Sequence, residues 1–259
     1  MLRPRIVPCL LVHNNGLVKT VNFKSPKYVG DPINAVKIFN EKESDELIVL
    51  DIDATVNNRE PNYNMIACLA AECRMPLCYG GGVRTAAQAK KIIGLGVEKV
   101  AISAAIIDTP ELITQIADEV GSQSVVAVFD VKKRLFSKDY DIYTHNGIKK
   151  TKHTLFEMVA KVQALGAGEI VVNSIDNDGQ MKGFDRDLAL RIKQMAHIPI
   201  TILGGAGSLK DIGELVRQCG IIGAAAGSLF VFKGVYRAVL ISYPTPTEKN
   251  ELLRTYFCV

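Results

Sequence analysis

Short, almost wholly apolar runs alternate along the chain with longer segments in which apolar residues recur at helical spacing. The apolar runs are residues 5–12, 46–51, 76–79, 99–102, 124–130, 169–173, 199–203 and 221–225. The helical segments are residues 32–42, 86–95, 110–120, 155–165, 187–195 and 209–219. Continuous apolar runs are typical of strands covered on both faces, and strand–helix alternation is typical of a parallel sheet. The pattern predicts an α/β fold, a single (β/α)8 or TIM barrel.

The two halves of the chain are similar to each other. Residues 76–83, which end on a run of glycines, resemble residues 199–207, and the pair Ile52-Asp53 resembles Ile175-Asp176. A repeat of half the chain length indicates duplication within one closed fold and not an open array of small repeats. We therefore expect one barrel domain with an internal two-fold repeat, spanning residues 1–259 with half-barrels at about 1–122 and 123–259.

Composition narrows the class of protein. Of 259 residues, 48% are hydrophobic and 22% charged, which is compatible with a large core and excludes disordered or collagen-like chains. The net charge of +4 comes without a long basic run and Trp is absent, so nucleic-acid binding is not expected. No apolar stretch approaches the roughly 20 residues of a membrane helix, and residues 6–12 lack the cleavage pattern of a secretion signal. The expected location is the cytoplasm.

Neither metal binding nor disulfide formation is indicated. No C-x-x-C pair and no zinc-like histidine spacing occurs among Cys9, Cys68, Cys73, Cys78, Cys219 and Cys258. We predict reduced, mostly buried thiols. Residues 176–179 are similar to part of a calcium loop, but the remaining acidic ligands and the terminal glutamate are missing. A turn or an anion-binding loop is the better interpretation, and no metal or cofactor is expected.

Functional residues of such a barrel come from the carboxyl ends of its strands and from the loops that follow. Two glycine-rich loops, residues 80–82 and 204–207, stand at matching positions. Glycine lets backbone N–H groups approach an anion closely, and a following helix adds the positive end of its dipole. One such loop alone would more simply be a tight turn. Its duplication favours two phosphate sites, and hence an elongated ligand with a phosphate at each end.

Two titratable residues at the same end are candidates for proton transfer. Asp130 closes the fifth apolar run, and a carboxylate beside apolar walls has its pKa raised toward neutrality. An aspartate that braces the next loop is the alternative. His13 follows the first run and lies where chemistry is expected, whereas the remaining histidines are assigned to loops or the surface: His145, His153 and His197.

Charged residues mark the opposite end of the predicted barrel. Each stands at or next to the start of a strand: Arg5, Glu46, Lys99 and Glu169. They could form a salt-bridged ring that closes the barrel bottom, because isolated charges there would be costly. Ordinary solvated strand ends are the alternative, and spacing alone does not decide between the two.

Taken together, the motifs resemble the cyclase subunit of imidazole glycerol phosphate synthase, an amidotransferase complex of histidine biosynthesis. The resemblance covers nearly the whole chain, and its motifs are specific only in combination. They are Arg5-Ile-Val-Pro-Cys-Leu10, Lys19, Asn22-Phe23, Gly30-Asp-Pro32, Asp45-Glu-Leu47, Leu50-Asp-Ile52, Gly80-Gly-Gly82, Leu112-Ile-Thr-Gln-Ile116, Gly121-Ser-Gln123, Gly166-Ala-Gly-Glu-Ile170, Ser174-Ile-Asp176, Asp178-Gly179 and Gly204-Gly-Ala-Gly207.

The resemblance implies a partner, a separate glutaminase (glutamine amidotransferase) subunit docked at the barrel bottom. In that family ammonia enters through a gate of four charged residues and crosses the barrel core. It then attacks a bisphosphorylated aminoimidazole carboxamide ribonucleotide, and the products are imidazole glycerol phosphate and an aminoimidazole carboxamide ribotide. The gate would be Arg5, Glu46, Lys99 and Glu169. The phosphorylated small-molecule ligand would be held by Lys19, Gly82, Ser103, Asp178, Gly179, Gly204, Gly205, Gly227 and Ser228.

The resemblance breaks at the catalytic residues. The family uses one aspartate on the first strand and its mirror on the fifth; Asp130 matches the second, but Leu11 occupies the first position. An alkyl side chain neither donates nor accepts a proton, and losing one general acid or base typically costs about 10²- to 10⁴-fold in rate. His13, Ser103-Ala104 and Val231 also replace family residues at this end.

Two hypotheses follow. In the one we favour, the chain is a paralogue that conducts ammonia to the amination or amidination of a surface-polysaccharide sugar, with a separate sugar amidotransferase receiving the ammonia. In the other, it is a working cyclase of histidine biosynthesis in which His13, on the same strand face as Leu11, replaces the lost acid. A sugar-phosphate isomerase is a distant third, since it would not need the basal gate.

Overall fold

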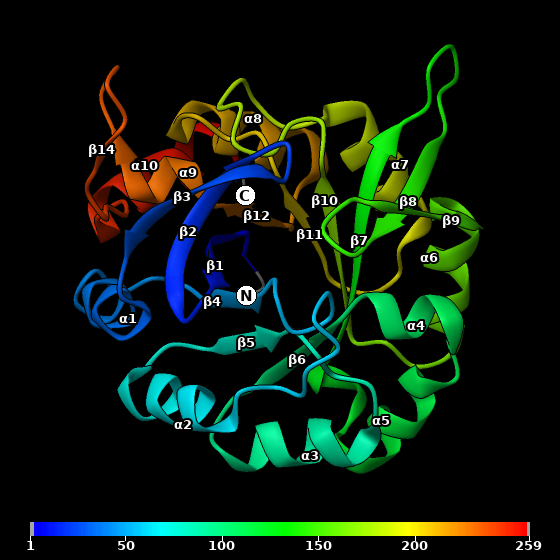
Figure 1. Cartoon of the computed structure of the whole chain (residues 1–259). Helices are drawn as coiled ribbons and strands as arrows, with labels where there is room; N and C mark the ends of the chain where they lie inside the picture. The colour runs from blue at the N-terminus through cyan, green and yellow to red at the C-terminus, as the bar shows by residue number, and fades with distance from the viewer. Residues whose placement is uncertain (1–2, 258–259) are drawn as a thin grey trace.

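A closed barrel of eight parallel strands forms the centre of the computed structural model, which describes residues 3–257 (Figure 1). The barrel strands are β1 (Arg5–His13), β4 (Leu47–Asp51), β5 (Leu77–Gly80), β6 (Lys99–Ile102), β7 (Val125–Lys133), β10 (Glu169–Ser174), β11 (Ile200–Leu203) and β12 (Gly223–Ala226). Parallel pairing continues from β12 to β1 and from β7 to β10, so the sheet closes on itself. The predicted TIM barrel is confirmed. Cys258 lies outside the described residues.

Helices surround the barrel and cover its outer face (Figure 1). They are α1 (Pro32–Glu41), α2 (Tyr63–Glu72), α3 (Ala86–Gly94), α4 (Ala104–Asp108), α5 (Leu112–Val120), the 3-10 turn Ser122–Ser124, α6 (Leu155–Ala164), α7 (Arg186–Met195), α8 (Leu209–Cys219), α9 (Ser228–Val231) and α10 (Pro246–Tyr256). Side chains fix several helix starts: Asp31 caps α1, and Thr154 and Ser208 form capping boxes with Glu157 and Asp211. None of these helices is long and apolar enough to cross a membrane.

Several elements were not predicted. They are helices α2, α4, α9 and α10 and the hairpin strands β2 (Gly16–Val21), β3 (Lys24–Gly30), β8 (Tyr140–Thr144), β9 (Lys149–Thr154), β13 (Phe232–Lys233) and β14 (Ala238–Val239). Strands β3 and β9 are mostly exposed, and neither carries the apolar run of a barrel strand. They belong to antiparallel extensions of β1 and β7 beyond the barrel. They are strands because they pair with a neighbouring strand, and their own hydrophobic pattern does not indicate it.

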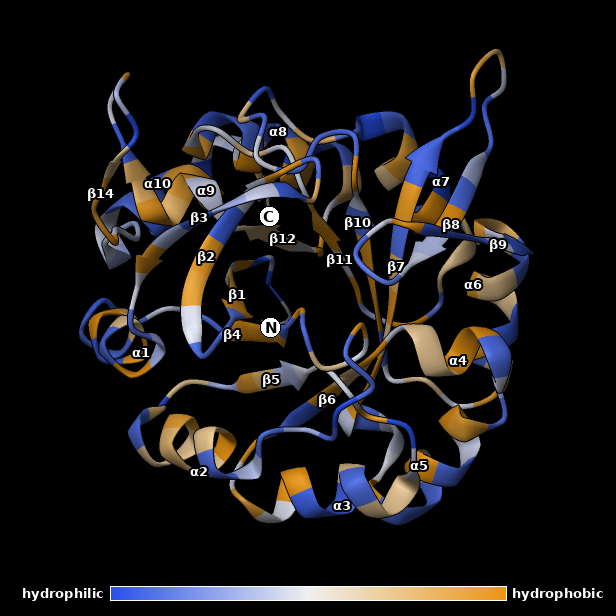
Figure 2. Ribbon diagram, in the orientation of Figure 1, coloured by the Kyte–Doolittle hydropathy of each residue, from blue (hydrophilic) through white to orange (hydrophobic). Residues whose placement is uncertain are grey.

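The core has two layers separated by the barrel wall. On β1, Ile6 and Leu10 pack outward against the helices, whereas Val7 and Cys9 point into the barrel. The inner layer is small and apolar, with Val126, Val128 and Val171 among its members. Figure 2 shows hydrophobic residues along both the strands and the helices around them. Successive side chains of a strand point to opposite faces, so every second residue points into the barrel. Charged residues at the strand ends that fall on this inner face therefore point toward the barrel axis.

Candidate functional site

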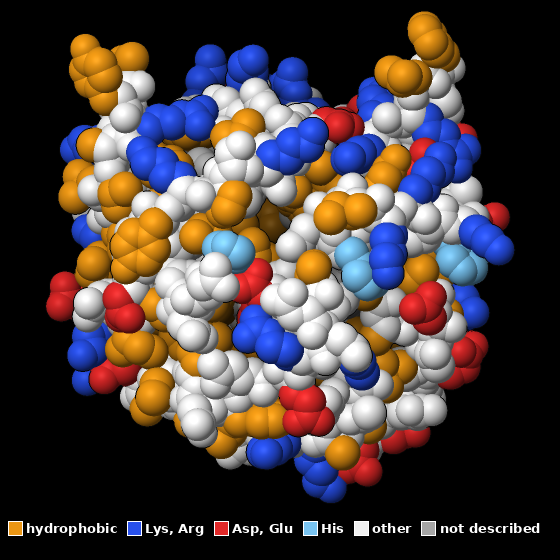
Figure 3. Space-filling view, viewed as in Figure 1, with side chains coloured by type: hydrophobic (Ala, Val, Ile, Leu, Met, Phe, Trp, Pro, Cys, Tyr) orange, Lys and Arg blue, Asp and Glu red, His pale blue; other side chains and the backbone are white. Residues whose placement is uncertain are grey.

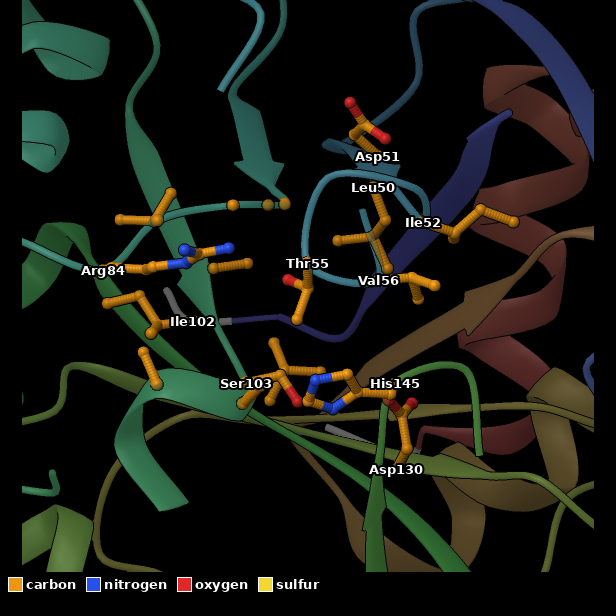
Figure 4. A pocket seen from close by; sticks show the side chains of 18 of the residues that line it. Leu50, Asp51, Ile52, Thr55, Val56, Arg84, Ile102, Ser103, Asp130 and His145 are labelled. Carbon is orange, nitrogen blue, oxygen red and sulfur yellow. The ribbon is translucent and has the colours of Figure 1, made fainter. Parts of the chain in front are cut away.

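Two cavities open at the carboxyl ends of the barrel strands. The first, of about 670 Å³, is lined from the loops after β4, β5 and β6, and Figure 4 shows Asp130, Ser103 and His145 against it. The second, of about 640 Å³, is lined from β1 and β2 and from the loops after β10, β11 and β12. Asp130 belongs to the lining of both. The fold therefore places this carboxylate between two spaces large enough for small ligands.

Asp130 is held by its neighbour on the next barrel strand. Asn173 Nδ2 donates a hydrogen bond of 2.9 Å to Asp130 Oδ1. Burial raises the pKa of Asp130 to about 7; the Asn173 hydrogen bond opposes the rise, and the nearby Asp178 carboxylate adds to it. A carboxyl group with this pKa can exchange a proton near neutral pH. The geometry thus suits the role proposed for Asp130, and that role stays a prediction.

Leu11 lies on the inner face of β1 and lines the second cavity together with Asp130. It packs beside Leu50 on the apolar interior of the barrel. His13 lies two residues further along β1 and also lines the second cavity. Its Nδ1 is 2.7 Å from Asp53 Oδ1, and Asp53 Oδ2 also accepts from Asn14 N at 2.8 Å. Asp53 therefore orients His13, a contact between distant segments that spacing along the chain does not reveal.

The loop glycines adopt backbone conformations that side chains rarely allow. Gly82, Gly179, Gly204 and Gly205 all have positive φ. A Cβ on Gly179 would stand 2.2 Å from Thr20 O, and one on Gly205 would stand 2.1 Å from Gly183 O. The backbone of these loops therefore packs directly on neighbouring loops. All four glycines border one of the two cavities, as do Ser103, Asp178, Gly227 and Ser228.

Lys19 lies on β2, where its side chain is buried beneath the loop after β12. Its ammonium donates to Cys9 O, and a Cβ on Gly227 would come within 2.4 Å of Lys19 Nζ. Burial lowers the pKa of Lys19, although Cys9 and Asp178 oppose this. Asp178 accepts from Thr20 Oγ1 at 2.7 Å, and burial raises its pKa. Both predicted ligand residues therefore line the second cavity, and each is held by a hydrogen bond to a residue of β1 or β2.

Two basic residues and a histidine that were not predicted as site residues border the first cavity. Arg84 follows the glycine loop after β5, and His145 and Lys149 come from the β8–β9 hairpin. Lys149 Nζ lies 3.2 Å from His145 Nε2, and burial followed by the positive charge of Lys149 lowers the pKa of His145. His145 does lie in a turn, as the sequence predicts. The turn stands over the mouth because β8 and β9 extend β7, which the hydrophobic pattern could not reveal.

At the opposite end of the barrel, four charged side chains form a closed set of ion pairs, here called the basal ring: Arg5, Glu46, Lys99 and Glu169. Lys99 Nζ is 2.7 Å from Glu46 Oε1 and 2.8 Å from Glu169 Oε2. Arg5 pairs with Glu169 at 2.7 Å and with Glu46. Both glutamates are buried. Of the two alternatives that the sequence left open, the structure shows the ion-paired ring and not solvated strand ends.

A further polar residue joins the basal ring. Thr201 on β11 is buried, and its Oγ1 donates to Glu169 Oε1 at 2.6 Å. A Cβ on Gly223 would stand 1.9 Å from this Oγ1, so the glycine on β12 makes room for the hydroxyl. Burial raises the pKa of Glu169, but the hydrogen bonds and charges of Arg5 and Lys99 outweigh this and lower it to about 2. Glu169 is therefore ionised at neutral pH.

Among the described residues, no group of three or more His, Cys, Asp or Glu side chains is placed to hold a metal ion. The cysteines within residues 3–257 are free.

Comparison with known proteins adds the following. The family described as histidine biosynthesis protein matches residues 5–237. The chain is 57% identical over 253 residues to a Vibrio vulnificus protein provisionally named imidazole glycerol phosphate synthase subunit HisF3, with 98% of this chain and 97% of the relative covered. It is 55% identical over 252 residues to a provisionally named HisF subunit of Leptospira borgpetersenii, with coverage of 97% and 99%.

The chain is also similar, at lower identity, to a relative whose name is not provisional. The imidazole glycerol phosphate synthase subunit HisF of Pelodictyon phaeoclathratiforme is 36% identical over 233 residues, which cover 90% of this chain and 92% of the relative.

Proposed function

The chain belongs to the histidine biosynthesis protein family, and from this premise we propose that it is a cyclase-type subunit of a glutamine-dependent complex. In that complex a separate glutaminase subunit sits against the basal ring and releases ammonia into the barrel. The similar proteins named above are called subunits of a synthase, in agreement with this role.

The observation that carries the proposal is the basal ring itself. Two buried glutamates held by Arg5 and Lys99 close the amino-terminal end of the barrel. Directly above the ring the interior is apolar, with residues such as Val7, Val126 and Val171. Neutral ammonia can cross such a medium, whereas a bare ammonium ion would pay a large desolvation penalty. An ion-paired entrance below an apolar interior fits the transfer of ammonia better than a purely structural closure.

The finer proposal is that this chain conducts ammonia for another enzyme and does not itself form the imidazole ring. Its support is the asymmetry between the two ends: the basal ring is complete, while Leu11 lines the same cavity as Asp130 at the position where a second carboxylate would be needed. The acceptor we propose is a surface-polysaccharide sugar, aminated or amidinated by a separate amidotransferase. This acceptor rests on the family resemblance alone.

A second candidate, the active cyclase of histidine biosynthesis, is favoured by one observation. Asp130 has a pKa of about 7 between two cavities bordered by glycine loops, as a proton-transfer residue would need. His13, held by Asp53, would then supply the other proton. Under this alternative, the Asp130→Asn variant loses activity. In the ammonia-conducting role, the same variant still supports sugar amination in the reconstituted complex.

The decisive experiment measures cyclase turnover of the purified chain on the bisphosphorylated ribonucleotide with saturating ammonium salt, which bypasses the glutaminase. The unmodified chain is compared with Leu11→Asp and with Leu11→Asn, a matched control that is polar but does not titrate. If the unmodified chain and Leu11→Asn show no turnover while Leu11→Asp does, the result supports an intact pocket that no longer acts as a cyclase. Turnover in the unmodified chain refutes the ammonia-conducting role.

A further inference from the structure

Two hairpins project from the mouth of the barrel and end in exposed hydrophobic residues. The connection between β7 and β8 carries Leu135 and Phe136, which are 86% and 107% exposed. The connection between β13 and β14 carries Val235 and Tyr236, each 96% exposed. Figure 3 shows both tips as orange projections on opposite sides of the mouth. We call them the β7–β8 prong and the β13–β14 prong.

Both prongs are anchored on the same loop of the mouth. At the base of the β7–β8 prong, Lys133 N donates to Asp176 Oδ2 at 3.0 Å. In the β13–β14 prong, Arg237 Nη2 donates to Gly179 O at 3.2 Å. The segment from Asp176 to Gly179 follows β10, and its end lines the second cavity. The two apolar tips are therefore attached to a single loop that borders the mouth.

Further contacts fix the conformation of each prong. Arg134 Nε lies 2.5 Å from Asp141 Oδ1, and Arg134 N donates to Asp139 O at 2.9 Å. On the other side, Lys27 Nζ stands 5.2 Å over the ring of Phe232 and donates to Arg237 O at 3.4 Å. Apolar side chains held out in water gain nothing for the stability of the isolated chain. Exposed aromatic residues of this kind are typical anchors of protein interfaces.

The charge around the prongs is mostly positive. Residues 132–141 of the β7–β8 prong contain four basic residues, Lys132, Lys133, Arg134 and Lys138, against two acids, Asp139 and Asp141, and the β13–β14 prong contains Lys233 and Arg237 with no acid. Blue side chains accordingly surround the upper part of the mouth in Figure 3. A partner surface that is complementary to the two prongs must combine acidic side chains with pockets for aromatic rings.

We propose that the two prongs clamp an acidic protein partner across the mouth of the barrel, and that this partner is the enzyme that consumes the ammonia. The inference rests on the proposed function. Ammonia that reached an open mouth would be protonated and lost to water, so the receiving enzyme has to cover the mouth. The prongs stand on either side of that opening and share the loop that borders it. A lipid surface could bind the same apolar and basic residues, but it would cover the mouth without consuming the ammonia.

The first experiment identifies what the prongs touch. The full chain, in complex with its glutaminase in its own cells, receives the photo-crosslinking residue p-benzoylphenylalanine in place of Phe136 or of Tyr236. Tyr28 on β3, which is exposed but lies outside both prongs, is the control position. We expect the same ammonia-consuming enzyme to be crosslinked from both prongs and not from position 28.

The second experiment measures affinity for that purified enzyme. Because the four tip side chains are exposed, replacing Leu135, Phe136, Val235 and Tyr236 by serine should leave thermal unfolding unchanged. Binding should weaken about tenfold or more, and added salt should weaken binding of the unmodified chain. Tyr28→Ser should bind like the unmodified chain. Serine variants that bind with unchanged affinity overturn the proposal.

Other crosslinking results overturn it as well: lipid adducts together with binding to phosphatidylglycerol vesicles, a second copy of this chain, different proteins from the two prongs, or one protein that does not use ammonia. Neither experiment depends on the basal ring or on Leu11. Failure of the docking proposal can therefore be told apart from failure of the proposed function, which the cyclase assay tests separately.

Discussion

At the scale of single residues, Asp130 is an acidic group removed from water by burial. Its pKa of about 7 means that the folded protein keeps it protonated where the unfolded chain, at about 3.8, has already lost the proton. The stability contribution of this group is fully present below pH 3.8 and is lost as the pH rises through 7. At neutral pH and above, the ionised Asp130 carboxylate at the mouth therefore lowers the free energy of unfolding.

Asp130→Asn removes that titration while keeping an oxygen that can accept from Asn173. We expect the variant to match the unmodified chain near pH 4 and to exceed its free energy of unfolding by about 1–3 kcal/mol at pH 8. Urea unfolding followed from pH 4 to pH 8 measures the difference. A difference that does not change with pH would contradict the assigned pKa.

Thr201 makes an equally local prediction at the basal ring. Thr201→Val keeps the shape of the side chain but removes the donor to Glu169, and we expect a loss of about 1–2 kcal/mol in the free energy of unfolding. Thr114→Val, where an exposed hydroxyl donates to Leu165 O, is the matched control and should change little. Equal effects in the two variants, measured by urea unfolding at pH 7, would show that the Thr201 hydroxyl has no special role.

At the scale of elements, the loops after the strands depend on glycine for close backbone packing. Gly205 has a φ of +112° and would place a Cβ 2.1 Å from Gly183 O, whereas Gly94 at the end of α3 has open space around it. The same substitution should therefore have opposite effects at the two positions.

We expect Gly205→Ala to lower the free energy of unfolding by about 1–3 kcal/mol, because it adds strain at a positive φ. Gly94→Ala should raise it by up to about 1 kcal/mol, because alanine is the better helix former. Denaturant unfolding measures both. Gly205→Ala should also weaken the binding of inorganic phosphate, and Gly94→Ala should not. An effect of the same sign on stability at both glycines would contradict this account of the loop.

At the scale of the whole molecule, the barrel has two chemically different ends joined by an apolar interior. The basal ring closes one end, and the two cavities with Asp130 between them occupy the other. The proposed conduction of ammonia needs both ends at once. Damage at the basal ring should therefore affect the use of glutamine without affecting the use of free ammonia.

For Lys99→Ala, we expect product made from glutamine to fall several-fold relative to product made from ammonium salt. Stability should fall as well, toward the lower end of about 3–5 kcal/mol, because both glutamates lose a partner while Lys99 is partly exposed. Lys90→Ala, which breaks the exposed pair with Glu119, is the control. Assays of the glutaminase complex with each nitrogen source supply the ratio. An unchanged ratio in Lys99→Ala would rule out a gating role for the ring.

Much of this architecture could be predicted from the order of residues. Strands buried on both faces must be apolar throughout, so β1, β7 and β10 stood out from pattern alone. The two glycine loops and Asp130 followed from the rule that strand ends meet at one mouth. The division into two half-barrels stays a prediction, although the paired glycine loops follow the third and seventh barrel strands.

What only the tertiary structure decided depends on contacts between distant segments. The polar strand β9 pairs with β8, which extends β7, and that pairing brings His145 and Lys149 to the first cavity. Spacing could place Arg5, Glu46, Lys99 and Glu169 near strand starts, but only barrel closure decides that they pair, and it adds Thr201 to them. Local pattern reports whether a residue faces an apolar or a polar environment. Which partner it meets there is set by the closure of the sheet, because that partner lies far away in the sequence.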